Sequence, residues 1–552
     1  MSFLSKLWQK RFYFFLLIFC VINFISLGYR VLLLETLSVF FLFILLYKYL
    51  PKIFNLGILV YGILGAFLFP ASYYYGTFQL AMVAAIMETN PSEAGEFLAT
   101  IPWYLYLYAV LFFFYTFFVI SQGRKHRQAL KQVSQRITYR RKNPLTKVIG
   151  ILLALAVIVY GLIHKPLGVA KELARDGTIN QVRELPQSKA FILVENSRVY
   201  PLVYPFKVFY AFKLYFEQKN KLEQGLTKES SWQVLDVNPH YKNYIVIVGE
   251  SVRQDFMQVY GAPFANTPYL NKAPAKFYHG YLSASQATYT SLLYTLYRFE
   301  PTTEQVYSED NILSLAKKAG FTSYWFSNQG YSGKFDSLAT KLALQADKSH
   351  FLTFNGFERI RSQDNALLPI IQRALNDQNT QPRLIVVHMI GSHPVFCRRI
   401  WDGVEFDYVN KELSCYVETI KQTDSFIEQI VQMAQATGES YSLMYFSDHG
   451  LAYSHTEDAN EMTLIHSPDF KQSYQVPFFV ISSDNQEQEH INFQQSATNF
   501  LQGFAEWTGI TLGQYQGYPS FWLGTEQPLK VFAGDKWVEF NSLKEQKFIP
   551  AK

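Results

Sequence analysis

The stretch YIVIVGE, residues 244–250, decides the fold of the second half of the chain. Its five consecutive apolar residues leave no polar face, which is typical of a strand buried on both sides. Four later segments have the same character: SYWFSNQG at 323–330, RLIVVHMIGSH at 383–393, YSLMYFSDHG at 441–450 and VPFFVISSD at 476–484. Helical segments such as DNILSLAKKAG, which ends in a glycine typical of a helix terminus, lie between them. This alternation predicts an α/β sandwich around a mostly parallel sheet.

Polar side chains gather where these strands end. In such sheets, sites form beyond the carboxyl ends of the strands, and the residues found there are Glu250, Asn328, His393, Asp448 and His449. Taken alone, the glutamate can simply cap a helix, and each histidine, including His388 and His466, is more often an ordinary polar residue. Carboxylate and imidazole ligands together suit a divalent ion such as zinc, with manganese as the alternative.

The first part of the chain has a different composition. Long apolar runs cover residues 12–50, 53–74, 101–120 and 147–163. Because about 20 apolar residues span a bilayer, we expect five spans, at 12–28, 32–49, 53–74, 101–120 and 147–163. A cleaved signal peptide does not fit, since further apolar segments follow and no small-residue cleavage site is evident. The prediction is therefore a transmembrane domain of about five helices over residues 1–164.

Basic residues predict the orientation of these spans. The segment GRKHRQALKQVSQRITYRRKNPLTK, residues 123–147, is rich in Lys and Arg and has no acid. A loop of this kind between two spans is typically cytoplasmic, so five crossings place the C-terminal part outside. The net charge of +6 then reflects topology, and no nucleic-acid partner is expected.

Residues 165–240 are expected to link the membrane domain to an exported catalytic domain over 241–552. Within the link, RVYPLVYPFKVFYAFKLYFEQKNKLEQ mixes aromatic and basic residues, which suits either an interfacial helix or a core helix of the exported domain. Of the three cysteines, Cys20 lies in the first span, and only Cys397 and Cys415 can form a disulfide in the exported domain.

The segment SQATYTSLL, residues 285–293, carries several hydroxyl side chains just before an apolar run. Serine and threonine in such a position usually cap a helix. One of them can instead be a nucleophile, and the segment alone does not separate these two roles.

The order of the motifs resembles a known family. GESVRQDF, NTPYL, a Thr-rich helix start, SNQGYSGKFD, HMIGSH, FSDHG and LIHSP follow one another, and METNPSEAGEFL precedes the fourth expected span. This order is similar to that of the phosphoethanolamine transferases of Gram-negative envelopes, members of the alkaline-phosphatase-like sulfatase superfamily. The resemblance implies a sulfatase-type α/β sandwich in the periplasm, attached to a multi-pass domain in the inner membrane.

The resemblance also implies site residues. The zinc ligands implied are Glu250, Thr290, Asp448 and His449, and Thr290 is the implied nucleophile, with Ser285 and Thr288 ordering the turn. Around the phosphoryl group it implies Lys334, His393 and His466, with His455 as a competitor for the last position. A metal-bound threonine hydroxyl is more easily deprotonated and is therefore a better nucleophile.

The implied reaction is metal-dependent transfer of phosphoethanolamine from phosphatidylethanolamine to lipopolysaccharide through a phosphothreonine-type intermediate. Because no cysteine lies around the nucleophile loop, unlike in lipid A enzymes of the family, a core sugar is favoured over lipid A. A sulfatase would need a C/S-x-P-x-R motif, which is absent. A phosphoglycerol transferase of the lipoteichoic-acid-synthase type usually has Ser-Asp after its threonine, and a transporter would need ionisable residues in the spans, where Glu35 is the main one.

Overall fold

The computed structural model describes residues 3–28, 31, 33–75, 80–88, 94–95, 98, 101–136, 148, 151–152, 154–156, 158–159, 204–329, 338–352, 363–454, 458–534 and 536–549. The chain divides into two compact units. One comprises residues 1–83 and 101–215, and the other comprises residues 84–100 and 216–552. The expected domain boundaries at 164 and 240 stay predictions, since much of the expected link, residues 165–203, lies outside the described residues.

The first unit is built from apolar helices. The long ones are α1 (Phe3–Ser26), α2 (Leu33–Tyr49), α3 (Pro51–Tyr75) and α6 (Trp103–Arg136). Among the described residues, two helical segments are long and apolar enough to cross a membrane, Pro51–Tyr73 and Trp103–Leu130. The expected span at 147–163 lies largely outside the described residues, so the number of five spans stays a prediction.

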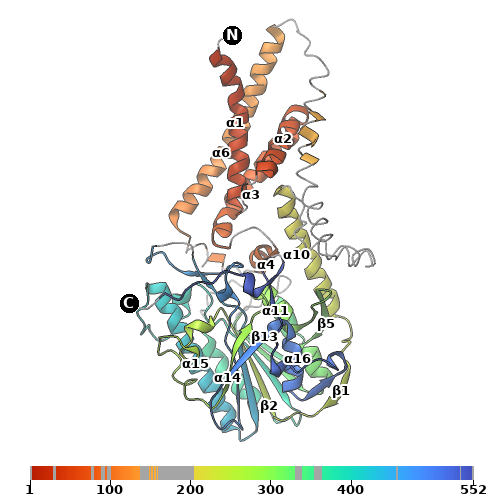
Figure 1. The fold of residues 1–552 in the computed structure, drawn as a ribbon, viewed down its shortest axis with the longest axis vertical. Coiled ribbons are helices and arrows are strands. Elements are labelled where there is room, and N and C mark those ends of the chain that lie inside the picture. Colours follow the sequence, from red (N-terminus) through yellow and green to blue (C-terminus); the bar gives the residue numbers. More distant parts are fainter. Residues whose placement is uncertain are drawn as a thin grey trace. The chain divides into compact units, whose positions relative to one another are not determined.

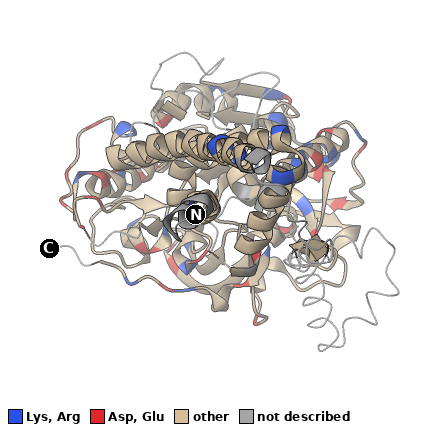
Figure 2. Ribbon diagram, turned by 90° about the horizontal axis from the view of Figure 1, so that it is seen from above, with Lys and Arg blue, Asp and Glu red and all other residues tan. Residues whose placement is uncertain are grey.

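Helix α6 differs from the expectation at its C-terminal end. The segment from Gly123 was expected to form a loop, but α6 continues through Arg136. Its polar part, SQGRKHRQALKQVSQR, is rich in Arg, Lys and Gln, which are good helix formers. The Lys and Arg residues of these last turns are blue in Figure 2. The predicted span ends at residue 120, where the apolar run ends, but the helix itself continues to Arg136.

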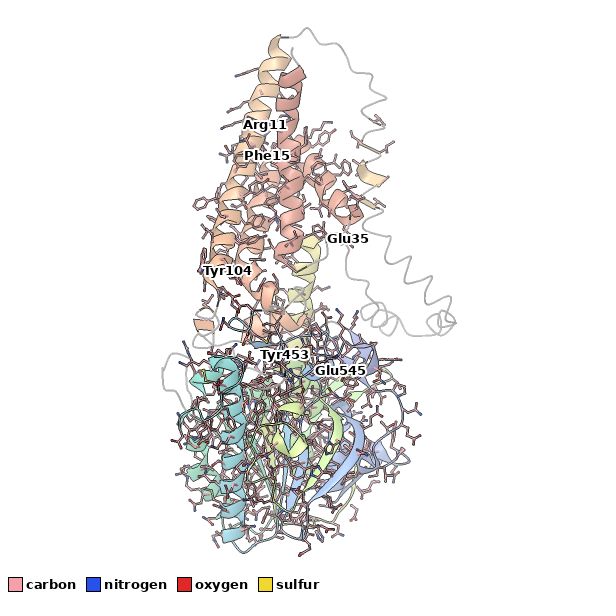
Figure 3. All side chains as sticks on the ribbon, turned by 60° about the vertical axis from the view of Figure 1, so that its left-hand side comes forward. Arg11, Phe15, Glu35, Tyr104, Tyr453 and Glu545 are labelled. Atoms are coloured by element: carbon pink, nitrogen blue, oxygen red, sulfur yellow. A yellow bond between two sulfur atoms is a disulfide. The ribbon has the colours of Figure 1, made fainter. Side chains whose placement is uncertain are left out.

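Small residues let the helices of this unit pack closely. A Cβ atom on Gly62 of α3 would lie 2.0 Å from Oγ1 of Thr116 in α6, so only glycine fits there. Polar side chains add contacts between helices: the Tyr115 hydroxyl of α6 donates to the carbonyl of Phe15 in α1 at 3.0 Å. Phe15, Tyr104 of α6 and Glu35 of α2 are labelled in Figure 3. These are the close contacts and small interface residues typical of helices packed in a membrane.

The second unit contains an eight-stranded sheet of order β13-β3-β12-β9-β2-β8-β6-β7. Strands β9, β2, β8, β6 and β7 are parallel, and β12 is antiparallel to both of its neighbours. The prediction of a mostly parallel sheet is confirmed. The bounds are β2 Asn243–Gly249, β3 Lys276–Leu282, β6 Thr322–Ser327, β7 Lys348–Phe351, β8 Arg383–His388, β9 Tyr441–Ser447, β12 Phe478–Ser482 and β13 Glu489–Ser496.

Helices cover both faces of this sheet (Figure 1). On one face, α14 (Leu368–Leu375) and α15 (Lys411–Ala436) form a core with alternate residues of the strands, such as Ile245 and Ile247. On the other face, Trp507 of α16 (Phe500–Trp507) packs edge-on against Tyr244 of β2. Successive side chains of a strand point to opposite faces of the sheet, so those of β2 enter two apolar layers. This explains the uninterrupted apolar run of β2.

The remaining helices include α11 (Thr288–Leu296), which begins inside SQATYTSLL, and α12 (Ile312–Lys318), which follows an Asn311 capping box. The others are α4 (Leu80–Glu88), α10 (Tyr204–Leu226) and α13 (Leu338–Ala343). Short strands form two-stranded pairs: β1 (Val234–Val237) with β14 (Ile510–Leu512), β4 (Tyr297–Glu300) with β5 (Gln305–Asn311), β10 (Ala452–Tyr453) with β11 (Leu464–Ile465), and β15 (Lys530–Phe532) with β16 (Trp537–Glu539).

Candidate metal centre and active site

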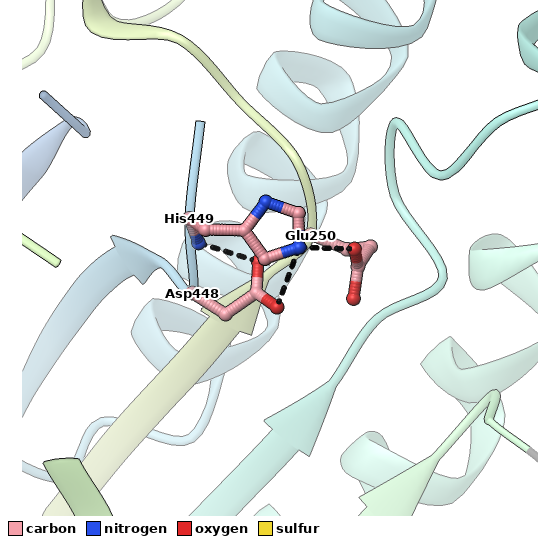
Figure 4. A group of neighbouring side chains, drawn as sticks. All are labelled: Glu250, Asp448 and His449. Carbon is pink, nitrogen blue, oxygen red and sulfur yellow. Dashed lines mark hydrogen bonds and ion pairs between the residues drawn. The ribbon is translucent and has the colours of Figure 1, made fainter. Parts of the chain in front are cut away.

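Three acidic and imidazole side chains meet at the carboxyl ends of two adjacent strands. Glu250 follows β2, and Asp448 and His449 follow β9. One ligand atom from each lies within 4.8 Å of the others, and all three residues are buried. His449 Nε2 lies 3.4 Å from Glu250 Oε1 and 3.4 Å from Asp448 Oδ2 (Figure 4). The sequence predicts these residues at this edge of the sheet, and the structure brings them together.

Backbone amides donate hydrogen bonds to one carboxylate oxygen of Asp448 and not to the other. Oδ1 accepts from the amides of Ser251 at 3.1 Å and His449 at 2.7 Å. Oδ2 is buried and accepts no hydrogen bond, and its neighbour in the cluster is His449 Nε2 at 3.4 Å. A buried carboxylate oxygen without a partner is costly, and a cation offsets that cost. This orphaned oxygen therefore fits a metal ion.

The imidazole of His449 is oriented in a way that also fits a metal. Its Nδ1 donates to the carbonyl of Gly450 at 2.9 Å, so Nε2 faces the two carboxylates. A histidine ligand typically donates its other ring nitrogen to a backbone carbonyl, which sets the tautomer. Two carboxylates and one imidazole form a donor set that suits zinc or manganese.

The charges in this cluster perturb one another. Burial raises the pKa of Asp448 to about 7, and the neighbouring charge of Glu250 adds to this rise. Burial lowers the pKa of His449, but the charge of Asp448 and the hydrogen bond to Glu250 outweigh it, and the pKa is raised to about 9. Burial also raises the pKa of Glu250, yet the contact with His449 outweighs it and leaves that pKa well below its usual range. Without a metal, a proton on His449 therefore supplies the balancing positive charge.

The hydroxyl that contacts the cluster belongs to Thr288, and the hydroxyl of Thr290, which was expected to be ligand and nucleophile, has other partners. Thr288 Oγ1 lies 3.2 Å from His449 Nε2 and donates to Glu250 Oε2 at 3.4 Å. Thr290 is fully buried, and its hydroxyl donates to Ser285 Oγ at 2.6 Å and to the Ala287 carbonyl at 3.3 Å.

The start of α11 explains why the two hydroxyls differ in position. Thr288 is the first residue of the helix. Residues two apart in a helix point about 200° from each other, at 3.6 residues per turn. With Thr288 on the cluster, Thr290 must turn away from it. The roles of the two residues in the reaction stay a prediction.

Two further histidines lie beside the cluster. The rings of His466 and His449 are 4.6 Å apart, and His466 Nδ1 donates to the carbonyl of Gln286 at 3.0 Å. Burial, and then the charge of His449, lower the pKa of His466 to about 3, so its ring is neutral at physiological pH. His393 lies in the turn after β8, where the amide of Ser392 donates to the Glu250 carbonyl at 3.1 Å. Lys334 and His455 lie outside the described residues.

The turn that carries His393 is held from two sides. Arg399 donates from Nε to the His393 carbonyl and from Nη2 to the Pro394 carbonyl, both at 3.1 Å. A disulfide joins Cys397, just beyond the turn, to Cys415 of α15, with a Cα–Cα distance of 5.0 Å. The disulfide that the sequence left open is thus present. His388, by contrast, is buried at the end of β8, where its Nδ1 contacts Ser327 Oγ at 3.1 Å.

Sequence reasoning missed two residues that organise the strand ends. Asp364 accepts from Asn328 Nδ2 and from the amides of Ile390 and Gly391, each at 2.9 Å, and so joins the ends of β6 and β8. Gln329 donates to Glu250 Oε2 at 3.0 Å. The position of Gln329 in the SNQ segment, at the end of a strand, could have indicated a site residue. Its partner Glu250, however, follows a different strand.

Known proteins share this architecture. Residues 242–510 match the Sulfatase family. The chain is 31% identical over 487 residues to phosphoethanolamine transferase OpgE of Escherichia coli, a match that covers 88% of this chain and 86% of that protein. This chain belongs to the phosphoethanolamine transferase family. As a family member it is a transferase of phosphoethanolamine with a sulfatase-like domain.

Solved structures of phosphoethanolamine transferases show the same fold. The integral membrane protein lipooligosaccharide phosphoethanolamine transferase A from Neisseria meningitidis matches with a TM-score of 0.57 at 16% identity, covering 86% of this chain and 88% of that one. The C-terminal periplasmic domain of E. coli EptC in complex with zinc matches with a TM-score of 0.50 at 19% identity, covering 57% of this chain and 96% of that one. This phosphoethanolamine transferase therefore combines apolar N-terminal helices with an alkaline-phosphatase-like C-terminal domain.

Proposed function

We propose that the protein transfers phosphoethanolamine from phosphatidylethanolamine to a sugar hydroxyl of the Gram-negative envelope, through a covalent intermediate on Thr288. One observation carries this proposal: the Thr288 hydroxyl lies within 3.4 Å of both His449 Nε2 and Glu250 Oε2, in a cluster that fits a metal ion. This position of Thr288 supports a role as the nucleophile, with its hydroxyl bound to that ion.

Zinc is the proposed ion, with manganese as the alternative. Glu250, Asp448 and His449 would hold it, together with the hydroxyl of Thr288, because these four donors converge and Asp448 Oδ2 accepts no hydrogen bond. When bound, the ion supplies positive charge that favours the deprotonated form of the threonine hydroxyl and offsets charge on the phosphoryl oxygens.

In the first step, the Thr288 oxygen attacks the phosphorus of the donor. A bond forms between Thr288 Oγ1 and phosphorus, and the bond from phosphorus to the diacylglycerol oxygen breaks. The neutral ring of His466 accepts the threonine proton and returns it to the diacylglycerol oxygen, so diacylglycerol leaves as an alcohol. The contact between His466 Nδ1 and the Gln286 carbonyl orients the ring for this transfer.

In the second step, the acceptor hydroxyl takes the place of diacylglycerol. His466 removes its proton, the sugar oxygen bonds to phosphorus, the bond to Thr288 breaks, and the proton returns to the threonine oxygen. His393 and Lys334 are proposed to contact the phosphoryl oxygens. Thr288 begins α11, so the amide groups of the first helical turn favour the anionic phosphoryl group.

The proposed acceptor is a core sugar of lipopolysaccharide rather than lipid A. The support is the absence of cysteine around the loop 283–293, where lipid A enzymes of this family have a disulfide. The proposed topology has five spans with the N-terminus inside and the catalytic unit in the periplasm, supported by the basic residues from Arg124 onward.

The test uses the full-length protein purified in detergent. With phosphatidylethanolamine alone, we expect release of diacylglycerol and one phosphoethanolamine group on Thr288, found by peptide mapping. Phosphatidylglycerol should give neither product. Supplied separately, lipid A, core oligosaccharide and a lipid-free glucan identify the acceptor: we expect modified core oligosaccharide. Labelling from phosphatidylglycerol would contradict the proposed donor, and modification of lipid A alone would contradict the core-sugar acceptor.

A further inference from the structure

Gln329 makes a direct contact with a proposed metal ligand that the reaction scheme does not use. It lies two residues beyond the end of β6, on the loop beside Glu250. Its side-chain Nε2 donates to Glu250 Oε2 at 3.0 Å and to the carbonyl of Met389, just after β8, at 2.9 Å. Both hydrogens of the amide thus have partners, one on the ligand and one on rigid backbone.

The contacts divide the two oxygens of Glu250 between different partners. Oε1 accepts from Ser251 Oγ at 2.7 Å and lies 3.4 Å from His449 Nε2. Oε2 accepts from Gln329 and, at a longer distance, from Thr288. A carboxylate held at both oxygens cannot rotate about its final bond, so its direction toward the cluster is set before a metal binds.

The backbone of Gln329 is itself fixed. Its amide donates to Ser327 Oγ at 3.0 Å, and the same hydroxyl donates to the Gln329 carbonyl at 3.1 Å. The adjacent Asn328 is tied through Asp364 to the turn after β8. The side chain therefore extends from a fixed base to a fixed carbonyl, with Glu250 Oε2 within reach.

We propose that Gln329 is a positioning residue that sets the metal affinity of the centre by orienting the Glu250 carboxylate through its amide. This inference rests on the proposed role of Glu250 as a metal ligand. Hydrogen-bond partners of metal ligands typically change metal affinity 10- to 100-fold when they are removed. A carboxylate at this position cannot replace the amide, because it has no hydrogen to donate to either partner.

The test is zinc binding to the full-length protein, measured by competition with a chromophoric chelator in the absence of lipid and saccharide. The Gln329→Met variant keeps the length of the side chain and removes the amide. We expect roughly 10- to 100-fold weaker zinc binding. The matched control is Gln488→Met. Gln488 also donates to two carbonyls, of Leu270 and Ala273, but precedes β13 at the opposite edge of the sheet. The zinc affinity of Gln488→Met should stay within about threefold of wild type, because Gln488 contacts no proposed metal ligand.

Donor cleavage supplies the second measurement. Since Gln329 acts through Glu250, saturating zinc should restore most of the activity of Gln329→Met, and the zinc concentration for half-maximal activity should rise with the dissociation constant. Unchanged zinc affinity in Gln329→Met overturns the inference, as does an activity loss that saturating zinc leaves in place, which would assign Gln329 to substrate contact. Wild-type protein that binds no zinc overturns the inference together with the zinc proposal. Zinc binding without transfer overturns only the proposed function.

Discussion

Exchanging Thr288 and Thr290 of α11 for valine, one at a time, distinguishes the proposed nucleophile from its neighbour. Valine keeps the branched shape and replaces the hydroxyl by a methyl group. Thr288→Val removes the hydroxyl that contacts both His449 Nε2 and Glu250 Oε2, so donor cleavage should fall on the order of 10⁴-fold or more, as when other catalytic nucleophiles are removed. No phosphoethanolamine adduct should form on this variant.

Thr290→Val is the matched control, and its expected effect is on stability. The Thr290 hydroxyl donates to Ser285 Oγ at 2.6 Å in a fully buried position. Loss of one such hydrogen bond costs about 1 kcal/mol, because Ser285 keeps its own bond to Gln286 Oε1. The adduct should still form on Thr288.

The assay is release of diacylglycerol from phosphatidylethanolamine, followed by peptide mapping of the trapped protein. Thermal unfolding of both variants confirms that each is folded. An adduct on Thr290, or normal turnover by Thr288→Val, would refute the geometric assignment. Loss of turnover in both variants, with both folded and zinc bound, would show that the loop and not a single hydroxyl carries the reaction.

Three more outcomes follow from the metal centre. Asp448→Asn removes one carboxylate of the cluster, so it should abolish the rise in melting temperature that zinc causes in wild type, which thermal scans with and without chelator would show. Zinc affinity, followed by calorimetry in two buffers, should weaken as the pH falls below about 9, because the raised pKa of His449 means that zinc must displace its proton; affinity independent of pH between 6 and 9 would contradict this. Gly391→Ala places a Cβ atom 3.2 Å from the backbone of Glu250 at a φ of +43°, so it should destabilise the protein by roughly 1–2 kcal/mol or more and weaken zinc binding. Gly320→Ala, at a φ of +80° in open space, should be destabilised with unchanged zinc affinity.

The sequence by itself determined the elements whose signal is local. Each apolar run from YIVIVGE to VPFFVISSD forms a strand of the central sheet, because a segment without a polar face is stable only where both of its faces are buried. The polar residues after those strands, Glu250, Asp448 and His449, lie together because parallel strands end at one edge. The predicted end of the helix at residue 120 differs from the structure, because α6 continues through polar residues to Arg136 and hydropathy does not distinguish a polar helix from a loop.

Only the tertiary structure decided which hydroxyl serves the site and what holds the ligands. Thr288 and Thr290 share one short motif, and the residue at which α11 begins determines which of them faces β2 and β9. A shift of that start by one residue would rotate every side chain by about 100°. Gln329 and Asp364 gain their contacts from backbone and side chains of other strands, up to 79 residues away in the chain. Such pairings depend on the packing of distant segments, which local sequence patterns do not encode.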